Sequence, residues 1–191
     1  MSRFDGVDFA TLPVHRLDVS APPPAEGFRP LRPEFSTYWK KGRVLREVGA
    51  SLAGCWYLAP QGNLSAYITL LADRLTLELP LLEGEGIRYR TFPAVKIGLL
   101  AADHRAKGAG AALMRWAFLY TVRELCPRLG ARFLTVDALH DPDDGYDVAD
   151  YYARFGFQHA AADTKPKPGG HFRTMFFDLK PLIEAAGNLA I

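Results

Sequence analysis

The apolar positions of this chain fall into short runs of strand-like spacing and longer stretches of helical spacing. The run CWYLA, residues 55–59, and the stretch 64–79 predict a hairpin, because a turn of Pro, Gln, Gly and Asn separates them. The later part of the second stretch alternates apolar and polar residues, which is typical of a strand with one buried face. Further strands are predicted over 95–102, 132–139 and 171–179, and one more begins at Phe157.

Apolar residues at helical spacing predict helices in three places: residues 34–53, 108–125 and 148–155. Gly42 and Gly49 weaken the first of these stretches, so we expect two short helices there. Pro127 is expected to stop the second helix, because proline cannot continue a helix, and Gly156 is expected to close the third. After the last strand we expect only a short tail. The order of elements predicts an α/β (α+β) fold, a mixed sheet with helices packed on it.

Length and composition indicate one globular domain with an appended segment. The chain has 191 residues, of which 49% are hydrophobic and 23% charged, which is enough to bury a full core. Prolines crowd residues 1–33, so we expect a proline-rich arm packed on the domain, with residues 34–191 forming a single domain. The net charge of +2 does not by itself require a nucleic-acid partner.

The two cysteines, Cys55 and Cys126, lie far apart and lack the spacing of metal ligands. This argues against a disulfide scaffold or a zinc site and favours a reducing compartment. No stretch approaches the roughly 20 apolar residues of a membrane span, and the first residues lack the apolar core of a signal peptide. We therefore expect a cytoplasmic protein with no metal and no membrane partner.

The first chemical signal is the sequence RAKGAG at residues 105–110, which follows the predicted strand 95–102. Glycine lets the backbone approach a ligand closely, and the start of the next helix offers free N–H groups and a partial positive charge. This order of elements predicts a pyrophosphate-binding site. The turn is not a Walker A loop, and it is a poor dinucleotide fingerprint because Leu113 stands where the third glycine belongs. A tight packing turn is the alternative.

The second signal is the sequence YYARFGF at residues 151–157. Aromatic residues on a short helix are usually core residues. However, Tyr151 and Tyr152 are adjacent and point in different directions, so both cannot belong to the core. This leaves one tyrosine for a functional role.

Together the two motifs resemble those of the GCN5-related N-acetyltransferase family. In that family a strand leads into Q/R-x-x-G-x-G/A and a helix, and a later helix ends in hydrophobic-Tyr-x-x-x-Gly-Phe. Residues 105–110 match the first pattern, and residues 151–157 match the second with Tyr152 at the family's tyrosine. The resemblance covers about residues 64–179. It implies a mostly antiparallel sheet with splayed central strands, flanked by helices.

The resemblance also implies acetyl-CoA as the cofactor. The backbone of Gly98, Leu99 and Leu100 is expected to pair with the pantetheine arm like an added strand. The turn after the strand is expected to hold the pyrophosphate, chiefly through the Arg105 side chain and the N–H groups of Lys107, Gly108, Gly110 and Ala111. The full set of turn residues assigned to the cofactor is Arg105, Ala106, Lys107, Gly108, Ala109, Gly110 and Ala111.

The reaction that the resemblance implies is direct attack of an amine on the thioester in a ternary complex. A backbone N–H near Leu100 would polarise the carbonyl, and Tyr152 would protonate the leaving thiolate as a general acid. The base that deprotonates the acceptor ammonium is left open. Its candidates are Asp137, Asp103, His140 and Glu78, and His140 stands where the family commonly has Asn.

The acceptor is expected to be a primary amine on a small molecule or a peptide. An acidic loop is predicted over residues 140–147, and it looks like an insertion relative to the family. The loop is either a solvated turn or an attractant for a cationic acceptor. It lacks the terminal Glu of a calcium-binding loop.

A looser resemblance is to the toxin acetyltransferases of toxin–antitoxin pairs, which modify the amino group of aminoacyl-tRNA. It rests on two N-terminal helices followed by Tyr-x-Thr-Leu, here residues 67–70. tRNA is therefore an alternative acceptor, and a non-catalytic acyl-CoA-binding module is the alternative of another class. A homodimer and an antitoxin partner are left open. A set of basic residues has two possible roles: they form a solvated surface, or they contact phosphates. They are Lys40, Lys41, Arg43, Arg46, Arg88, Arg90, Lys165 and Lys167.

Overall fold

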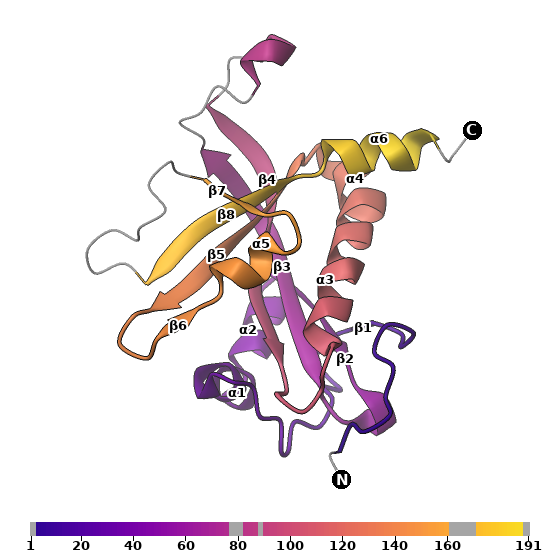
Figure 1. The fold of residues 1–191 in the computed structure, drawn as a ribbon. Coiled ribbons are helices and arrows are strands. Elements are labelled where there is room, and N and C mark those ends of the chain that lie inside the picture. The colour runs from indigo at the N-terminus through magenta and orange to yellow at the C-terminus, as the bar shows by residue number, and fades with distance from the viewer. Residues whose placement is uncertain (1–2, 77–81, 88–89, 161–170, 189–191) are drawn as a thin grey trace. The chain divides into compact units, whose positions relative to one another are not determined.

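The structure is a computed structural model, and it describes residues 3–76, 82–87, 90–160 and 171–188. The chain divides into two compact units, and Figure 1 labels the helices and strands that they contain. The first unit contains the described residues up to Leu71 together with Gly98–Leu119. The second unit contains Ala72–Ile97 and the described residues from Tyr120 onwards. The predicted boundary between an arm of residues 1–33 and a domain of residues 34–191 stays a prediction.

The strands form a sheet in the order β1-β2-β3-β4-β5-β8-β7, with β6 paired to β5. Strands β4 and β5 are parallel, whereas the pairs β1–β2, β2–β3, β5–β6, β5–β8 and β7–β8 are antiparallel. The predicted mixed, mostly antiparallel sheet is therefore confirmed. The strands are β1 His15–Arg16, β2 Gly54–Leu58, β3 Ala66–Thr76, β4 Thr91–Ala102, β5 Phe133–Asp141, β6 Tyr146–Asp147, β7 Gln158–His159 and β8 Phe172–Asp178.

In the first unit, two short helices pack on the β2–β3 hairpin, as the sequence predicts. They are α1, Pro33–Lys40, and α2, Arg43–Gly49, and Gly42 joins them with a left-handed φ of 65°. Trp39 of α1 packs against Tyr67 of β3, with ring centroids 4.9 Å apart and ring planes at 47°. The Tyr67 hydroxyl donates a hydrogen bond of 2.9 Å to a carbonyl of α1, that of Phe35. Aromatic packing and this partly buried hydrogen bond therefore fix the helix pair to the sheet.

Apolar side chains of the N-terminal segment belong to the core of the first unit. Leu17 and Phe28 are buried in the same core cluster as Trp39 and Tyr67. The arm also adds the short strand β1 to the edge of β2. It is therefore an ordered part of the first unit over its described residues.

The long helix begins at Ala109, one residue after the predicted start, and it does not stop at Pro127. Helix α3, Ala109–Tyr120, continues through a π-helical turn, Thr121–Leu125, into α4, Cys126–Leu129. Pro127 lies in the first turn of α4, where a helix does not need its missing N–H. The helix ends instead at Gly130, which has a left-handed φ of 62°.

In the second unit, β5 pairs with β8 along its length around a core of Phe92, Phe133 and Phe176. Helix α5, Ala149–Ala153, follows β6, and the predicted short tail is wrong because α6, Lys180–Asn188, closes the described chain. The predicted loop over residues 140–147 is also wrong in part. Its ends pair as the β5–β6 hairpin, and only the turn between them lacks strand structure. Among the described residues, no helix has the length and apolar character that crossing a bilayer requires.

Candidate active site

The glycine turn lies between the end of β4 and the start of α3, as the sequence predicts. Gly108 has a φ of 90°, which side chains rarely adopt, and a Cβ there would point into open space. The N–H groups of Ala106, Ala109 and Ala112 are used within the turn and the first helical turn. The backbone conformation at this position, rather than close packing, therefore requires glycine at residue 108.

Four N–H groups of this turn have no acceptor within the described part of the chain. They belong to Lys107, Gly108, Gly110 and Ala111, the set predicted to hold the pyrophosphate. Such groups at a helix start carry a partial positive charge and are satisfied by an anion. These unused donors therefore fit the diphosphate of coenzyme A. The assignment of these residues to the cofactor stays a prediction.

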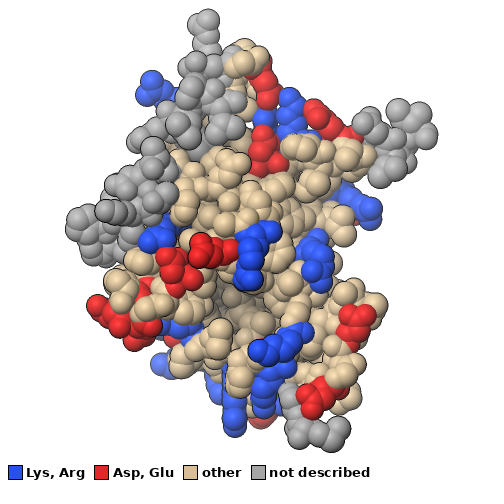
Figure 2. Space-filling view, in the orientation of Figure 1, with Lys and Arg blue, Asp and Glu red and all other residues tan. Residues whose placement is uncertain are grey.

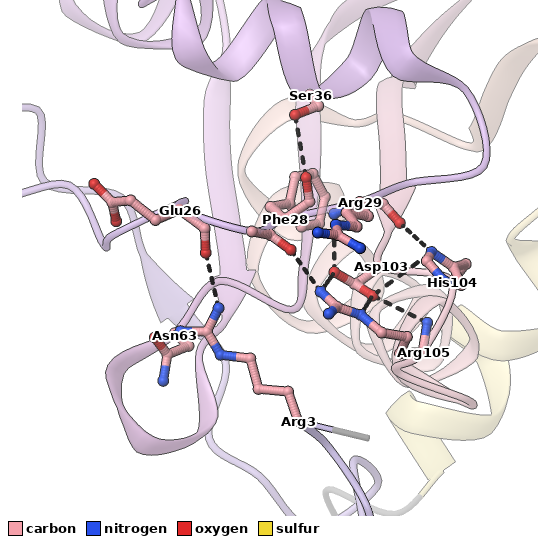
Figure 3. A network of polar contacts seen from close by, with 10 residues as sticks. Arg3, Glu26, Phe28, Arg29, Ser36, Asn63, Asp103, His104 and Arg105 are labelled. Atoms are coloured by element: carbon pink, nitrogen blue, oxygen red, sulfur yellow. Dashed lines mark hydrogen bonds and ion pairs between the residues drawn. The ribbon is translucent and has the colours of Figure 1, made fainter. Parts of the chain in front are cut away.

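The Arg105 side chain, expected on the pyrophosphate, is bound instead to Asp103 and the arm (Figure 3). Its Nε lies 2.8 Å from Asp103 Oδ1 and its Nη2 lies 2.7 Å from Oδ2, and Nη2 also donates to the Gly27 carbonyl. Its cofactor contact stays a prediction. The structure gives it a structural role as well, because it connects the arm to the turn.

The Asp103 carboxylate is the centre of this network. Its side chain is 0% exposed, and it accepts hydrogen bonds from the backbone N–H of Arg29 and of Arg105. His104 makes two contacts with the Arg29 carbonyl oxygen. Its backbone nitrogen lies 2.9 Å from this oxygen, and its ring Nδ1 lies 2.8 Å from it. Burial raises the pKa of Asp103, but the hydrogen bonds from Arg105 and Arg29 outweigh it and leave that pKa below its ordinary value. Asp103 is thus an ionised anchor, which makes it a poor candidate for the base.

The strand segment expected to bind pantetheine, Gly98 to Leu100, adjoins Thr69 of β3. The Thr69 hydroxyl accepts a hydrogen bond of 2.8 Å from the Leu99 N–H. Successive N–H groups of a regular strand point to opposite edges, so the Leu100 N–H is expected at the edge away from β3. The parallel ladder pairs Ala94–Ile97 of β4 with β5. The expected splaying beyond that ladder stays a prediction.

Gly98 is required by close packing, and replacing it with alanine is expected to lower the free energy of unfolding by about 1–2 kcal/mol. A Cβ there would lie 2.7 Å from Leu71 Cδ2 and 2.9 Å from Thr69 Oγ1. The Leu71 end can rotate away, but the Thr69 hydroxyl is held by its hydrogen bond to Leu99. Urea denaturation measures the change. Gly49→Ala on α2 is the control, because its Cβ would meet open space, and equal stabilities of the two variants would contradict the prediction.

A cavity of about 380 Å³ lies beside this strand segment, entirely within the first unit. Its polar lining comes from Tyr38 of α1, Glu47 of α2 and Thr69. Burial raises the pKa of Tyr38, and a hydrogen bond to the Glu47 carboxylate raises it further. The remaining lining residues are Leu52, Ala53, Leu71, Gly98 and Leu99.

The predicted general acid, Tyr152, lies on α5 in the second unit. It is 7% exposed, and its ring packs against Phe157 and Tyr151 with centroids 5.7 Å and 5.4 Å away. Burial, with smaller contributions from Tyr151 and Tyr146, raises the pKa of Tyr152 above its ordinary value. The hydroxyl therefore keeps its proton at neutral pH, as a proton donor must.

The other candidates for the base have partners in the second unit, and Glu78 lies outside the described residues. Asp137 accepts hydrogen bonds from Lys96 at 2.5 Å and from Thr174 at 2.8 Å. His140 Nδ1 lies 3.2 Å from Asp147 Oδ2, and that carboxylate also pairs with Arg173. The assignment of Asp137 or His140 to catalysis stays a prediction.

Sequence reasoning missed two features of the first unit. One is the anchoring role of Asp103, although its place two residues before Arg105 was a usable signal. The other is the pairing of Glu47 with Tyr38 beside the strand segment 98–100. Glu47 is the acidic residue of an otherwise basic α2, and that contrast was visible in the sequence.

Acidic and basic side chains are interspersed on the face drawn in Figure 2. Local clusters of like charge are therefore more informative about binding surfaces than the net charge of +2. One such cluster lies on α1, α2 and the turn between them, where four basic side chains are exposed. We call it the basic helix pair, and it consists of Lys40, Lys41, Arg43 and Arg46.

No protein-family model and no curated protein matches the chain, but solved structures do. AtaT complexed with acetyl-methionyl-tRNAfMet matches at a TM-score of 0.73 and 18% identity, over 92% of this chain and 99% of that chain. A mutant of KacT gives a TM-score of 0.72 at 20% identity, over 92% and 98% of the two chains. AtaTR bound with AcCoA gives 0.67 at 21% identity, over 92% and 97%. The predicted fold and a structural resemblance to these proteins are therefore confirmed.

Proposed function

We propose that the chain is an acetyl-CoA-dependent N-acetyltransferase whose acceptor is the amino group of aminoacyl-tRNA. The observation that carries the proposal is the likeness, over 92% of the chain, to AtaT complexed with acetyl-methionyl-tRNAfMet. Four N–H groups of the glycine turn lack an acceptor among the described residues. They support binding of the cofactor, because they offer an anion site of the expected kind. This acceptor takes the place of the small-molecule or peptide amine that the sequence first favoured.

The chain's own residues have separate tasks in this proposal. Bound at the turn, acetyl-CoA supplies a thioester that an amine can attack directly. The N–H groups of Lys107, Gly108, Gly110 and Ala111 bind its diphosphate, and the start of α3 adds a favourable partial charge. The Leu100 N–H orients and polarises the acyl oxygen. Tyr152 holds a proton on Oη for the departing sulfur, since its raised pKa keeps it protonated.

A direct assay tests the proposed activity. The purified protein is incubated with radiolabelled acetyl-CoA and charged tRNAs, uncharged tRNA, peptides or small amines. We expect label on the charged tRNA alone, and expect in vitro translation to stop only when acetyl-CoA is present. Label on small amines but not on tRNA would overturn the acceptor. Binding of acetyl-CoA without transfer to anything would instead favour a non-catalytic acyl-CoA-binding module.

Replacing basic side chains of the basic helix pair with alanine is expected to weaken tRNA binding and to leave acetyl-CoA binding unchanged. In the variant Lys40→Ala/Lys41→Ala/Arg43→Ala, KM for charged tRNA should rise, because phosphate contacts are lost. The slope of log KM against log salt should fall by about 0.7–0.9 for each lost contact. KM for acetyl-CoA should not change. Arg123→Ala, which removes an exposed charge of the second unit, is the control, and an equal effect of both variants would contradict the prediction.

A protein partner is proposed on the same footing. Another similar structure, at 18% identity and a TM-score of 0.68, is an AtaT mutant bound to the C-terminus of the antitoxin AtaR and acetyl-CoA. We propose that an antitoxin of this kind restrains the chain, and that both act in the cytoplasm. Copurification of the chain with the product of a neighbouring gene tests the partnership.

A further inference from the structure

We infer that the cavity beside β4 binds the aminoacyl group of the acceptor, with the Glu47 carboxylate receiving its ammonium and the leucine-lined wall receiving an apolar side chain. This inference rests on the proposed function and deepens it, because it names the class of amino acid. The first step is the position of the cavity. Its wall includes Gly98 and Leu99, the strand segment assigned to the reactive end of the cofactor. An amine held in this cavity would therefore lie close to the segment where the thioester is expected.

The second step is the charge of the cavity. Glu47 is the one charged side chain among its lining residues. It lies on α2, whose other two charged residues, Arg43 and Arg46, are exposed. A carboxylate in a mostly apolar wall gains most from a cationic ligand, and hydrogen bonds between charged groups are about twice as strong as neutral ones. An ammonium group is a cation that brings three donors to the carboxylate. The cavity thus suits an amine and disfavours an anionic ligand.

The third step is the orientation of Glu47. Tyr38 of the neighbouring helix lines the same cavity, and the Glu47 carboxylate raises the pKa of its hydroxyl. The Glu47 carbonyl, in turn, accepts a hydrogen bond of 2.9 Å from the Leu52 N–H, which fixes the loop after α2. A carboxylate flanked by a hydroxyl from the neighbouring helix has fewer rotamers to lose when it binds a ligand. Tyr38 is therefore a positioning residue for Glu47.

The fourth step is the apolar wall. The cavity volume of about 380 Å³ falls within the range of small-ligand sites, about 300–1,000 Å³. Leu71, Leu99 and Leu52 belong to its lining, and Leu52 is 67% exposed. Ser51 before it has a φ of 58°, a left-handed conformation that is uncommon for a residue with a side chain. A large exposed leucine beside a strained backbone is expected where a ligand covers it. An apolar aminoacyl side chain would bury it.

A pair of probes that differ only in the ammonium group tests the inference by binding. Leucinamide carries the ammonium and an apolar side chain, whereas 4-methylpentanamide has the same side chain without the amine. Calorimetry on the full-length wild type should show leucinamide binding about tenfold more tightly, which corresponds to about 1.4 kcal/mol. In Glu47→Gln this advantage should disappear, while acetyl-CoA affinity stays the same. Glu34→Gln is the control, because Glu34 is an exposed carboxylate of the adjacent helix, outside the cavity lining.

Turnover with charged tRNA separates this inference from the proposed function. If tRNA carrying methionine is acetylated by the wild type, Glu47→Gln should raise its KM about tenfold with a smaller change in kcat. tRNA carrying aspartate should be a poorer substrate than tRNA carrying methionine for the wild type, and Glu47→Gln should narrow that gap. Acetylation that is equal in the wild type and in Glu47→Gln, or equal affinity for the two amides, would overturn the inference but leave the proposed function intact. No acetylation of any charged tRNA would overturn both.

Discussion

Replacing Tyr152 with phenylalanine should lower kcat about 10²–10⁴-fold, the range typical of a lost general acid. The substitution removes one oxygen from a ring that keeps its packing against Phe157 and Tyr151. The free energy of unfolding and the affinity for acetyl-CoA should therefore change little. Because burial raises the pKa of Tyr152, wild-type kcat should not fall between neutral and mildly alkaline pH through loss of this proton. Single-turnover measurements across that range test both statements.

The neighbouring tyrosine provides the control for this experiment. Tyr151→Phe removes the same atom from the adjacent position of α5. We expect its kcat to stay within a few-fold of the wild type. Equal losses in the two variants would mean that the effect is structural, and an unchanged kcat in Tyr152→Phe would show that another group protonates the leaving sulfur.

Replacing Asp103 with alanine should lower the free energy of unfolding by about 3 kcal/mol, as breaking a buried charge pair does. The carboxylate is 0% exposed, whereas its partner Arg105 is 25% exposed, so water compensates part of the loss on the arginine side. The N–H groups of Arg29 and Arg105 would also lose their acceptor. Urea denaturation measures the loss, and the affinity for acetyl-CoA should fall with it because the turn loses its anchor.

Two further variants test whether the loss of stability comes from the buried ion pair. Asp143→Ala, in the exposed turn between β5 and β6, should change stability by less than about 0.5 kcal/mol. The double variant Asp103→Ala/Arg105→Ala should be less destabilised than the sum of the single variants, since the two side chains form one pair. Additive losses would show that the ion pair does not carry the effect.

The Asp103 network also predicts how stability depends on pH. The folded pKa of Asp103 lies below the value of the unfolded chain, so ionisation favours the folded state. This contribution is complete above the unfolded pKa, near 3.8, and it is lost as pH falls through the depressed folded pKa. The difference in stability between wild type and Asp103→Ala should therefore narrow in acid and stay constant from about pH 5 upwards.

The sequence predicted the strands and helices well where periodicity is strong. It placed the β2–β3 hairpin, the two short helices and the glycine turn, because each depends on local spacing and on glycine or proline. It failed at Pro127, since a π-helical turn lets a new helix begin there. It also failed at residues 180–188, where it predicted a short tail and the chain forms α6.

The same contrast holds for the candidate site. The four N–H groups of the turn could be predicted because they follow from the start of a helix. The partners of Asp103 and Arg105 could not, since Arg29 and Gly27 lie 74 and 78 residues away in the chain. Glu47 and Tyr38 meet across two helices, and periodicity does not specify such a pair of side chains.

The contacts of Gly27 and Arg29 with the turn have a thermodynamic consequence. They close a loop of more than 70 residues, so the turn takes its final form only after the chain has paid the entropy of that closure. Whatever binds the turn also stabilises the arm, by an amount set by its concentration relative to its Kd. The ordering of the arm and ligand binding at the turn are thus linked equilibria. A higher concentration of the ligand that binds the turn increases the fraction of molecules in which the arm is ordered.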